Sequence, residues 1–501
     1  MSIAIVYSRA QLGVKSPLVT IEVHLSNGLP SLSIVGLPEA AVKESKDRVR
    51  SAIINSRYEF PLKRITINLA PADLPKQGGR YDLPIALGIL AASGQIPKDD
   101  ILNYEYVGEL ALTGELRSVP GALPFTIAAK NAGRPVILPS ENAEEAALIQ
   151  DAQVYPARHM LEVCAHLEKQ TLLSQYENTH VTRSLETSSD LSEVKGQQHA
   201  KRALEIAAAG GHNLLFIGPP GTGKTMLASR LPSILPDMSE AESIETASVA
   251  SITQNLSSHN WKKRPFRSPH HTSSAVALVG GGSHPKPGEI SLSHNGVLFL
   301  DELPEFDRKV LEVLREPLET GQINISRAAH QVEFPARFQM IAAMNPCPCG
   351  YLGDENGRCR CSPDQVSRYK AKISGPLLDR IDLQIEVLNL KNSDLLDDKP
   401  SGESSAEVKQ RVEMAREQQL LRQEKANHLL SSKEISKHCS LDEKDKSLLQ
   451  VAIEKLGLSA RSVSRIRKVA RTIADLEGSE QILTSHLTEA ISYRRLDRNH
   501  S

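Results

Sequence analysis

The segment NLLFIGPPGTGKTMLASRL (213–231) constrains the fold more than any other part of the chain. It is typical of a buried strand, a loop rich in glycine and proline, and a helix. The loop matches G-x-x-x-x-G-K-[ST], a phosphate-binding pattern that requires this strand–loop–helix context. The segment therefore predicts a P-loop α/β fold. The residues predicted to bind the nucleotide are Gly218, Pro219, Pro220, Gly221, Thr222, Gly223, Lys224 and Thr225.

A second segment, VLFLDE (297–302), supplies the acids that such a loop needs. Glycines allow backbone N–H groups to surround phosphates, and the helix N-terminus adds a favourable dipole. We expect Lys224 to reach the β- and γ-phosphates of ATP, and Thr225 and Asp301 to hold Mg²⁺. Glu302 would polarise the attacking water. Alone, two acids after an apolar run are more often a strand end with surface charges, but the upstream loop favours the catalytic interpretation.

Composition limits the class of protein and the compartment. The chain has 501 residues, 40% of them hydrophobic and 24% charged, with a net charge of −1. This length predicts several domains, and the balance of charge means that any DNA contact must come from local basic loops. The longest apolar run, LPIALGILAASG (83–94), is too short for a bilayer, and the N-terminus lacks a signal pattern. We therefore expect a cytoplasmic protein with no membrane partner.

Changes in pattern divide the chain. Short β-rich and helical runs alternate in 1–168, which predicts an α/β domain. The polar stretch 169–189 is typical of a linker, and a second α/β block follows at 190–390. A second linker is predicted at 391–405. From 406 to 501 only helical patterns occur.

The order of motifs in the second block resembles that of AAA+ ATPases. The phosphate loop and the DE strand are followed by Met344–Asn345 at a strand end and by SGPLLDRID (374–382). The resemblance implies that Asn345 holds the attacking water with Glu302 and that Arg380 is an arginine finger inserted into a neighbour's site. In GLSARSVSRIRKVARTIADLEG (457–478), it implies that Arg461 contacts the γ-phosphate from a C-terminal helical lid. Each arginine considered alone has the alternative of a solvated surface charge.

An arginine finger acts where charge develops in the transition state, so a site that borrows one is incomplete in a monomer. The sequence therefore predicts a homo-oligomeric ring, of six subunits by family likeness.

Longer segments resemble one branch of the AAA+ proteins. RPFRSPHHTSSAVALVGGG (264–282) and FPARFQMIAAMNPCPCG (334–350) are similar to magnesium-chelatase-like members. IVGLPEAAVKESKDRVRSAIINS, near the N-terminus, resembles the ComM/YifB group, and the likeness extends over essentially the whole chain. It implies an ATP-driven DNA helicase that promotes branch migration in natural transformation and recombination. The alternative is a chelatase-like chaperone that remodels a protein partner without moving on DNA.

Two loops are candidates for contact with single-stranded or branched DNA. Alternation in GQINISRAAHQVEFPARFQ (321–339) predicts a β-hairpin, and GGGSHPKPGEI (280–290) is a second protruding loop. By family likeness both face the channel of the ring. Arg327 and His330 at one tip and Lys286 at the other would then contact phosphates. The alternative is an ordinary surface hairpin with solvated charges.

Residues 60–140 resemble the Lon protease domain without its catalytic groups. Arg80 stands where that family has its serine, and Leu123 and Phe125 occupy the candidate lysine positions. Without a hydroxyl nucleophile or an amine base no acyl-enzyme can form, so the sequence predicts a catalytically inactive, Lon-like α/β domain. Lys76, Arg80 and Arg117 would either contact DNA or belong to a solvated face.

Four cysteines follow Asn345 in NPCPCGYLGDENGRCRCSP (345–363). Two C-x-C pairs separated by a glycine-containing turn can place four thiolates around one tetrahedral Zn²⁺. Such a closed site would be structural, bracing the loop and Asn345. The alternative is a set of free or redox-active thiols. The proposed ligands are Cys347, Cys349, Cys359 and Cys361, whereas Cys164 and Cys439 are isolated.

Overall fold

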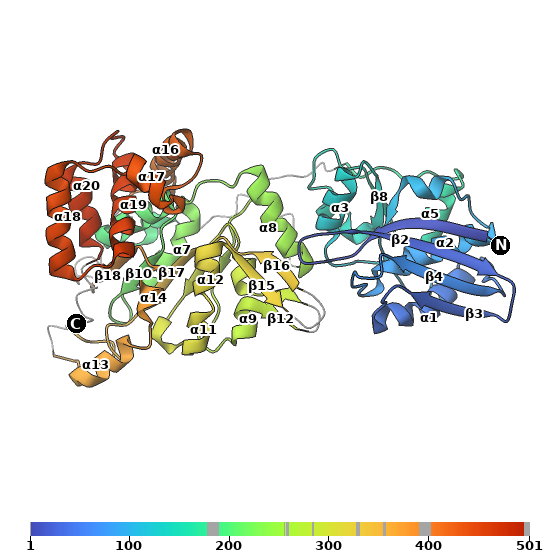
Figure 1. The fold of residues 1–501 in the computed structure, drawn as a ribbon, viewed down its shortest axis with the longest axis horizontal. Coiled ribbons are helices and arrows are strands. Elements are labelled where there is room, and N and C mark those ends of the chain that lie inside the picture. Colours follow the sequence, from blue (N-terminus) through green and yellow to red (C-terminus); the bar gives the residue numbers. More distant parts are fainter. Residues whose placement is uncertain are drawn as a thin grey trace.

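The computed structural model describes residues 2–177, 190–254, 256, 260–282, 285–326, 331–353, 357–389 and 402–494. An N-terminal α/β region leads into a second α/β region, and helices follow at the C-terminal end (Figure 1). No helix within the described ranges is long and apolar enough to cross a membrane.

The N-terminal region is built on a seven-stranded mixed sheet of order β3-β4-β2-β1-β5-β8-β9. Strands β1 and β2, and β2 and β4, pair antiparallel, and the remaining neighbours are parallel. The strands of the sheet are β1 (Ser2–Arg9), β2 (Leu18–Ser26), β3 (Ser31–Val35), β4 (Arg64–Ala70), β5 (Glu105–Tyr106), β8 (Val136–Pro139) and β9 (Val154–Ala157). A small hairpin pairs β6 (Glu109–Leu110) with β7 (Leu116–Arg117).

Helix α2 (Asp82–Ser93) contains most of the apolar run noted in the sequence, and almost all of its residues are buried against β1 and β2. A helix that is hydrophobic on all sides belongs in a core, which explains this run without a membrane. The other helices of the region are α1 (Ala40–Asn55), α3 (Ala122–Asn131), α4 (Ala143–Ala146) and α5 (Met160–Leu167).

Two of the three basic residues considered for DNA contact in this region are buried, so that prediction is wrong for both. Lys76 is inaccessible and donates to the Pro71 carbonyl, while Arg80 donates to Gln11 Oε1 at 3.0 Å and to a backbone carbonyl. Neither side chain is on a solvated face, because both are buried and donate to acceptors inside the domain. Arg117 is exposed.

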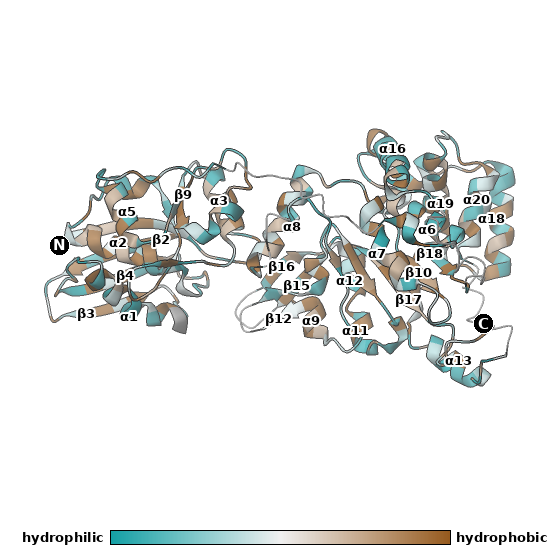
Figure 2. Cartoon of the chain, turned by 180° about the vertical axis from the view of Figure 1, so that it is seen from behind, coloured by the Kyte–Doolittle hydropathy of each residue, from teal (hydrophilic) through white to brown (hydrophobic). Residues whose placement is uncertain are grey.

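The second region has a fully parallel sheet of order β11-β14-β17-β10-β18. Strand β10 is the first of these strands in the chain but lies inside the sheet, and later strands pair with it on both sides. The carboxyl end of β10 is therefore a topological switch point. Ligands usually bind at such a point in parallel sheets. The central strands are largely hydrophobic, as buried parallel strands should be (Figure 2). The strands are β10 (Leu214–Ile217), β11 (Phe266–Arg267), β14 (Val297–Leu300), β17 (Gln339–Met344) and β18 (Leu383–Glu386).

Two hairpins project from this region. The predicted hairpin is confirmed: β15 (Gln322–Ser326) pairs antiparallel with β16 (Gln331–Pro335). A smaller one pairs β12 (Gly280–Gly281) with β13 (Lys286–Pro287). The helices of the region are α6 (Gln198–Gly210), α7 (Lys224–Ile234), α8 (Glu240–Ile252), α9 (Ala275–Val279), α10 (Glu289–Leu292), α11 (Arg308–Glu312), α12 (Arg315–Thr320), α13 (Pro363–Lys370) and α14 (Gly375–Leu378).

The C-terminal helices share a hydrophobic core with the parallel sheet. Helices α16 and α19 pack against α6, and their buried residues belong to the same apolar cluster as β10 and α7. A partly buried ion pair between Arg422 and Asp475 joins α16 to α19. The predicted domain boundary in this part of the chain stays a prediction. The helices are α16 (Ser405–Gln423), α17 (Ser432–His438), α18 (Glu443–Leu456), α19 (Ala460–Leu476) and α20 (Thr484–Ser492).

The N-terminal region contacts the second region at two places. Leu123 and Ala247 belong to an apolar cluster between α3 and α8, and the Gly121 N–H donates to the Ser251 carbonyl at 3.0 Å. The β1–β2 loop reaches the β15–β16 hairpin, where Leu12 and Val14 pack on its apolar face. A side chain at Gly13 would collide with the hairpin backbone, so a glycine is required there.

Candidate nucleotide site

The phosphate-binding loop follows β10 at the switch point of the sheet. A side-chain carbon at Gly218 would collide with the Val387 carbonyl after β18, so this glycine permits two backbone segments to approach. Gly223 has φ +83° and starts α7 at Lys224. The loop thus ends at a helix N-terminus, where N–H groups and the helix dipole favour an anion.

Lys224 lies inside the loop. Its ammonium donates to the carbonyls of Gly218 and Pro219, both at 2.7 Å, and to Asn345 Oδ1 at 3.3 Å. Burial lowers the pKa of Lys224, and the charges of Asp301 and Glu302 oppose that shift. A cation held only by neutral oxygens has no partner of full opposite charge, so a phosphate would be a better ligand for it than the present carbonyls.

Thr225 and Asp301 come together, as Mg²⁺ binding would require. Thr225 Oγ1 donates to Asp301 Oδ2 at 2.7 Å, and the pair is exposed to solvent. The other carboxylate oxygen accepts the Glu302 N–H at 2.9 Å, which orients Asp301 at the end of β14. A carboxylate and a hydroxyl oxygen suit Mg²⁺, which completes its shell with waters and phosphate oxygens.

Glu302 is held by a residue that the sequence analysis did not select. Its backbone is left-handed, with φ 52° and ψ 46°, and its Oε2 lies 3.1 Å from His271 Nδ1. The signal was present in the sequence, because two adjacent histidines, His270 and His271, follow β11, which is paired in parallel with β14. Parallel neighbours bring their carboxyl ends to the same edge of a sheet.

Asn345 links the nucleotide loop to the cysteine segment. It follows β17, which lies between β14 and β10, and it accepts from Lys224. Gly350, with φ +83°, lies so close that a side-chain carbon there would be 2.7 Å from Pro220 Cδ and 3.8 Å from Asn345 Cγ. The cysteine segment therefore contacts both the phosphate loop and the predicted water-binding residue.

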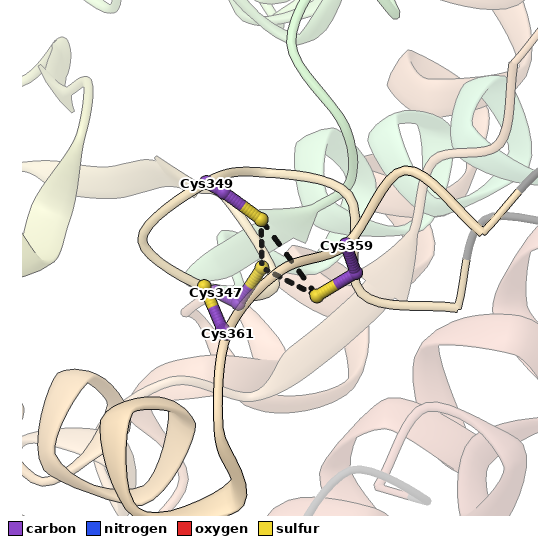
Figure 3. Close-up of side chains that lie close together, drawn as sticks. All are labelled: Cys347, Cys349, Cys359 and Cys361. Atoms are coloured by element: carbon purple, nitrogen blue, oxygen red, sulfur yellow. Dashed lines mark hydrogen bonds between the residues drawn. The ribbon is translucent and has the colours of Figure 1, made fainter.

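The four clustered cysteines have the geometry of one metal site. Their sulfur atoms converge from two arms of the loop and all lie within 4.8 Å of one another (Figure 3). The sulfur–sulfur distances are 3.4 Å from Cys347 to Cys349, 3.8 Å from Cys347 to Cys359 and 3.7 Å from Cys349 to Cys359. A tetrahedron with zinc–sulfur bonds of about 2.3 Å has edges of about 3.8 Å.

Backbone donors favour thiolate at Cys349, whereas at Cys359 and Cys361 a backbone donor is outweighed by desolvation and the neighbouring cysteines, which raise the pKa, that of Cys361 to about 11. The N–H groups of Tyr351 and Arg360 lower the pKa of Cys349 to about 6. A thiolate is the form that binds metal. By contrast, burial raises the pKa of Cys164 to about 12 and that of Cys439 to about 11, as expected of isolated thiols in a core.

The contacts of Arg380 are with residues outside the nucleotide loop. It is 5% exposed, donates to the Pro376 carbonyl at 2.6 Å and pairs with Glu319. Burial lowers the pKa of Arg380, and Glu319 opposes the shift. Three more arginines are close enough for their charges to act on it: Arg315, Arg461 and Arg465.

The first turn of α19 lies beside Arg380. Ser459 Oγ donates to Asp379 Oδ1 at 3.5 Å, Arg465 pairs with Asp382, and Arg461 is exposed. The two arginines predicted to act on the γ-phosphate thus lie in one basic cluster, while Lys224, Thr225, Asp301, Glu302 and Asn345 form another group.

The predicted DNA contacts are described only in part. Lys286 is exposed on the β12–β13 hairpin. Arg327 and His330 lie outside the described residues.

The parallel sheet, its phosphate loop and the acidic strand end define a P-loop protein of the AAA+ type with a helical C-terminal region. Three family models agree in matching parts of the chain to the ChlI subunit of magnesium chelatase. "Magnesium chelatase, subunit ChlI" matches residues 190–395, "Subunit ChlI of Mg-chelatase" matches 21–142, and "Magnesium chelatase, subunit ChlI C-terminal" matches 402–494. The chain belongs to the ComM/YifB group of this magnesium-chelatase-like family.

The full-length relatives show how far the similarity extends. Competence protein ComM of Haemophilus influenzae is 57% identical over 99% of this chain and 98% of its own length. Protein YifB of Escherichia coli, whose function is uncharacterized, is 55% identical over 99% and 98%. A partial match, 25% identical over 39% of this chain and 19% of the relative, is the DNA replication licensing factor mcm6 of Dictyostelium discoideum.

Proposed function

We propose that this protein is a ring-forming ATPase that uses ATP and Mg²⁺ to move on branched or single-stranded DNA, as a branch-migration helicase in natural transformation and recombination. Two features support the ATPase: the group formed by Lys224, Thr225 and Asp301, and the membership of a magnesium-chelatase-like AAA+ family. The cytoplasm is the compartment that this function requires.

The observation that carries the proposal is the separation of the catalytic groups into two clusters. Arg380 makes its contacts with Glu319 and Pro376, and the charge of Arg461 acts on Arg380. A head-to-tail contact between copies brings different surfaces together and closes into a ring when the rotation permits. Arg380 would then reach the phosphates of the next subunit, in a ring that we propose to be hexameric, and Arg461 would contact the γ-phosphate from the helical C-terminal region.

The names of relatives and the position of the hairpins support DNA as the substrate. One full-length match is a competence protein, and a partial match is a DNA replication licensing factor. Lys286 is exposed on the β12–β13 hairpin, and we propose that it acts with Arg327 and His330 on the phosphate backbone. The N-terminal region would serve as an inactive, Lon-like docking domain.

We also propose that the cysteine cluster binds one structural Zn²⁺. Sulfur distances of 3.4 to 3.8 Å and the convergence of all four sulfur atoms within 4.8 Å support four ligands around one ion, and backbone donors favour the thiolate form of Cys349. Gly350 lies close to Pro220 and Asn345, which suggests a role for the metal. A loop made rigid by the ion would fix the position of Asn345 relative to the phosphate loop.

ATP turnover measured with and without forked DNA tests the function. We expect DNA to raise the turnover of the parent protein several-fold, and a strand-separation assay to detect unwinding. Glu302→Gln, which keeps the fold but removes the base, should lower kcat by about 10²-fold with or without DNA. A turnover that does not respond to DNA, together with stimulation by a protein partner, would favour the chelatase-like chaperone instead.

A further inference from the structure

A cavity of about 280 Å³ lies beside α8, and it is separate from the nucleotide site. One side is the face of α8 that carries Thr246 and Ala250, and the other is the segment 260–267 that leads into β11. None of the described residues that line it belongs to the phosphate loop or to the acidic strand end. The volume is near the lower end of those of ligand pockets, about 300 Å³, so it suits a group as small as one planar ring system.

Trp261, the chain's one tryptophan, lines this cavity. Its side chain is half-buried, because part of it packs on the apolar cluster between α3 and α8. Phe266 also lines the cavity and stacks on the buried Phe299 of β14, with ring centroids 6.0 Å apart. Between the two aromatic residues, Arg264 fixes the segment by donating to two backbone carbonyls at 2.6 and 2.7 Å. The aromatic lining is therefore positioned by the fold before a ligand binds.

The charges around the cavity favour an anion. Its described lining includes four basic residues and no carboxylate; the basic residues are Lys262, Lys263, Arg264 and Arg267. The arginines are engaged within the fold, since Arg267 donates twice to Glu289, at 2.6 and 2.7 Å. The two lysines are exposed directly after Trp261. An aromatic ring beside surface ammonium groups is the combination that binds the bases and phosphates of a nucleic-acid strand.

Helix α10 connects the cavity to the β12–β13 hairpin. Leu292 at the end of α10 lines the cavity, and α10 packs against both α8 and β11. At most about 20 Å of chain separates Leu292 from Lys286 of the hairpin, which lies six residues earlier, at about 3.3 Å per residue. A strand with about 3.4 Å between nucleotides covers this distance with about six of them. One DNA strand can therefore contact both the hairpin and the cavity.

We propose that this cavity is a second binding site for single-stranded DNA, in which an unpaired base stacks on Trp261 and the flanking phosphates contact Lys262 and Lys263. A duplex does not suit the site, because its bases stack on one another and leave no free face for the ring. The site holds the strand and takes no part in ATP hydrolysis. The choice of DNA rests on the proposed function, whereas the affinity of the cavity for an unpaired base beside a phosphate does not.

The fluorescence of Trp261 provides a direct test, because the chain has no other tryptophan. Addition of a single-stranded oligothymidylate to the full-length protein should quench this fluorescence, since the base stacks on the ring. An abasic oligonucleotide of the same length carries the same phosphates without bases. It should leave the fluorescence nearly unchanged.

Variants separate the base from the phosphates, with binding measured by polarisation of a labelled strand. Trp261→Leu should weaken binding by about tenfold, the loss expected for one stacked base, whereas Trp261→Phe keeps a ring and should retain most of the affinity. The double variant Lys262→Ala/Lys263→Ala should reduce the slope of log affinity against log salt by about 1.4, because each phosphate contact to a single strand contributes about 0.7. Lys433→Ala/Lys437→Ala removes two exposed lysines of α17 and should leave the slope unchanged. The lysine variants alter only exposed side chains, so they test the site even if Trp261→Leu does not fold.

Each remaining outcome decides against part of the proposal. If the strand binds and raises ATP turnover but leaves the tryptophan fluorescence unchanged, the cavity is not the site and the motor function stands. Equal quenching by the abasic strand would refute the stacked base, and a parental salt slope in Lys262→Ala/Lys263→Ala would refute the phosphate contacts. If quenching and the variants behave as expected but DNA does not raise ATP turnover, the binding site stands and the proposed motor function fails. A parent protein that binds no single-stranded DNA would overturn both.

Discussion

The two α/β regions of this chain both place charged side chains at strand ends, but the charges differ in burial and in the partners that neutralise them. In the N-terminal region Glu105 is fully buried and accepts two hydrogen bonds from Arg9 and one from Arg134. In the parallel sheet, Thr225 and Asp301 meet at the surface, and Lys224 has only neutral oxygens as acceptors. Charges that neutralise each other inside a domain hold the fold, whereas charges left without a full counter-charge at a glycine-rich loop can bind a ligand.

The comparison bears on the prediction that the N-terminal region is catalytically inactive. Arg80, at the position of the serine in the Lon likeness, donates to Gln11 and to a carbonyl. Asp82 is buried against Arg48, and burial raises the pKa of Asp82 to about 6. A perturbed pKa alone therefore does not mark catalysis here, because the carboxylate already has its partner.

The largest expected effect is that of Arg380→Ala. An arginine finger contributes about 10³-fold or more to turnover, so the variant should lose that factor while still binding ATP. Measurement of ATP turnover checks this. Glu319→Gln is the matched control, because it breaks the ion pair of Arg380 but leaves the guanidinium in place. It should retain most of the activity.

Mixing two inactive variants provides a second test of the arginine finger. When Arg380→Ala and Lys224→Ala chains are combined in equal amounts, about a quarter of the head-to-tail interfaces should regain both an intact loop and an intact finger. Turnover of the mixture should exceed that of either variant alone. Turnover at the parent rate by Arg380→Ala alone would contradict the assignment of the finger.

The second prediction concerns the buried ion pair of the N-terminal region. Glu105→Gln leaves Arg9 buried without its counter-charge and should destabilise the N-terminal region by about 3 kcal/mol. Thermal unfolding should show this loss, while ATP turnover at low temperature changes little. Asp100→Asn, which breaks the exposed pair with Lys169, should cost less than about 1 kcal/mol. A similar cost in the two variants would refute the distinction.

The smallest expected effect concerns the cysteine loop. Replacing Cys359 and Cys361 by serine should abolish binding of one zinc per chain. ATP turnover should fall by about tenfold, because loss of groups that hold the residues of a site in place has effects of this size. Elemental analysis and a turnover assay provide the two readings. Serine at Cys164 and Cys439 should leave the metal content unchanged. Purified parent protein without stoichiometric metal would contradict the zinc site.

Much of this architecture could be predicted from short motifs because each motif depends on local geometry. The glycines of the phosphate loop, the apolar strand before Asp301 and the alternation of the β15–β16 hairpin are signals carried by adjacent residues. Convergence of the four cysteines followed from their spacing and the glycine-containing turn between the pairs.

Other features depend on the fold as a whole and could not be read from local patterns. The burial of Lys76 and Arg80 depends on carbonyls and an amide that the tertiary structure brings to them. The contact of His271 with Glu302 depends on which strand lies beside β14. Periodicity describes one element at a time, so it cannot show which elements are neighbours in a sheet.

The common hydrophobic core of the parallel sheet and the C-terminal helices has a consequence for the intact chain. Because α16 and α19 bury their apolar residues against α6 and α7, a proteolytic cut between residues 389 and 402 would not release an independent helical fragment. The two pieces would stay associated, as the halves of a nicked protein do when each covers the other's apolar surface.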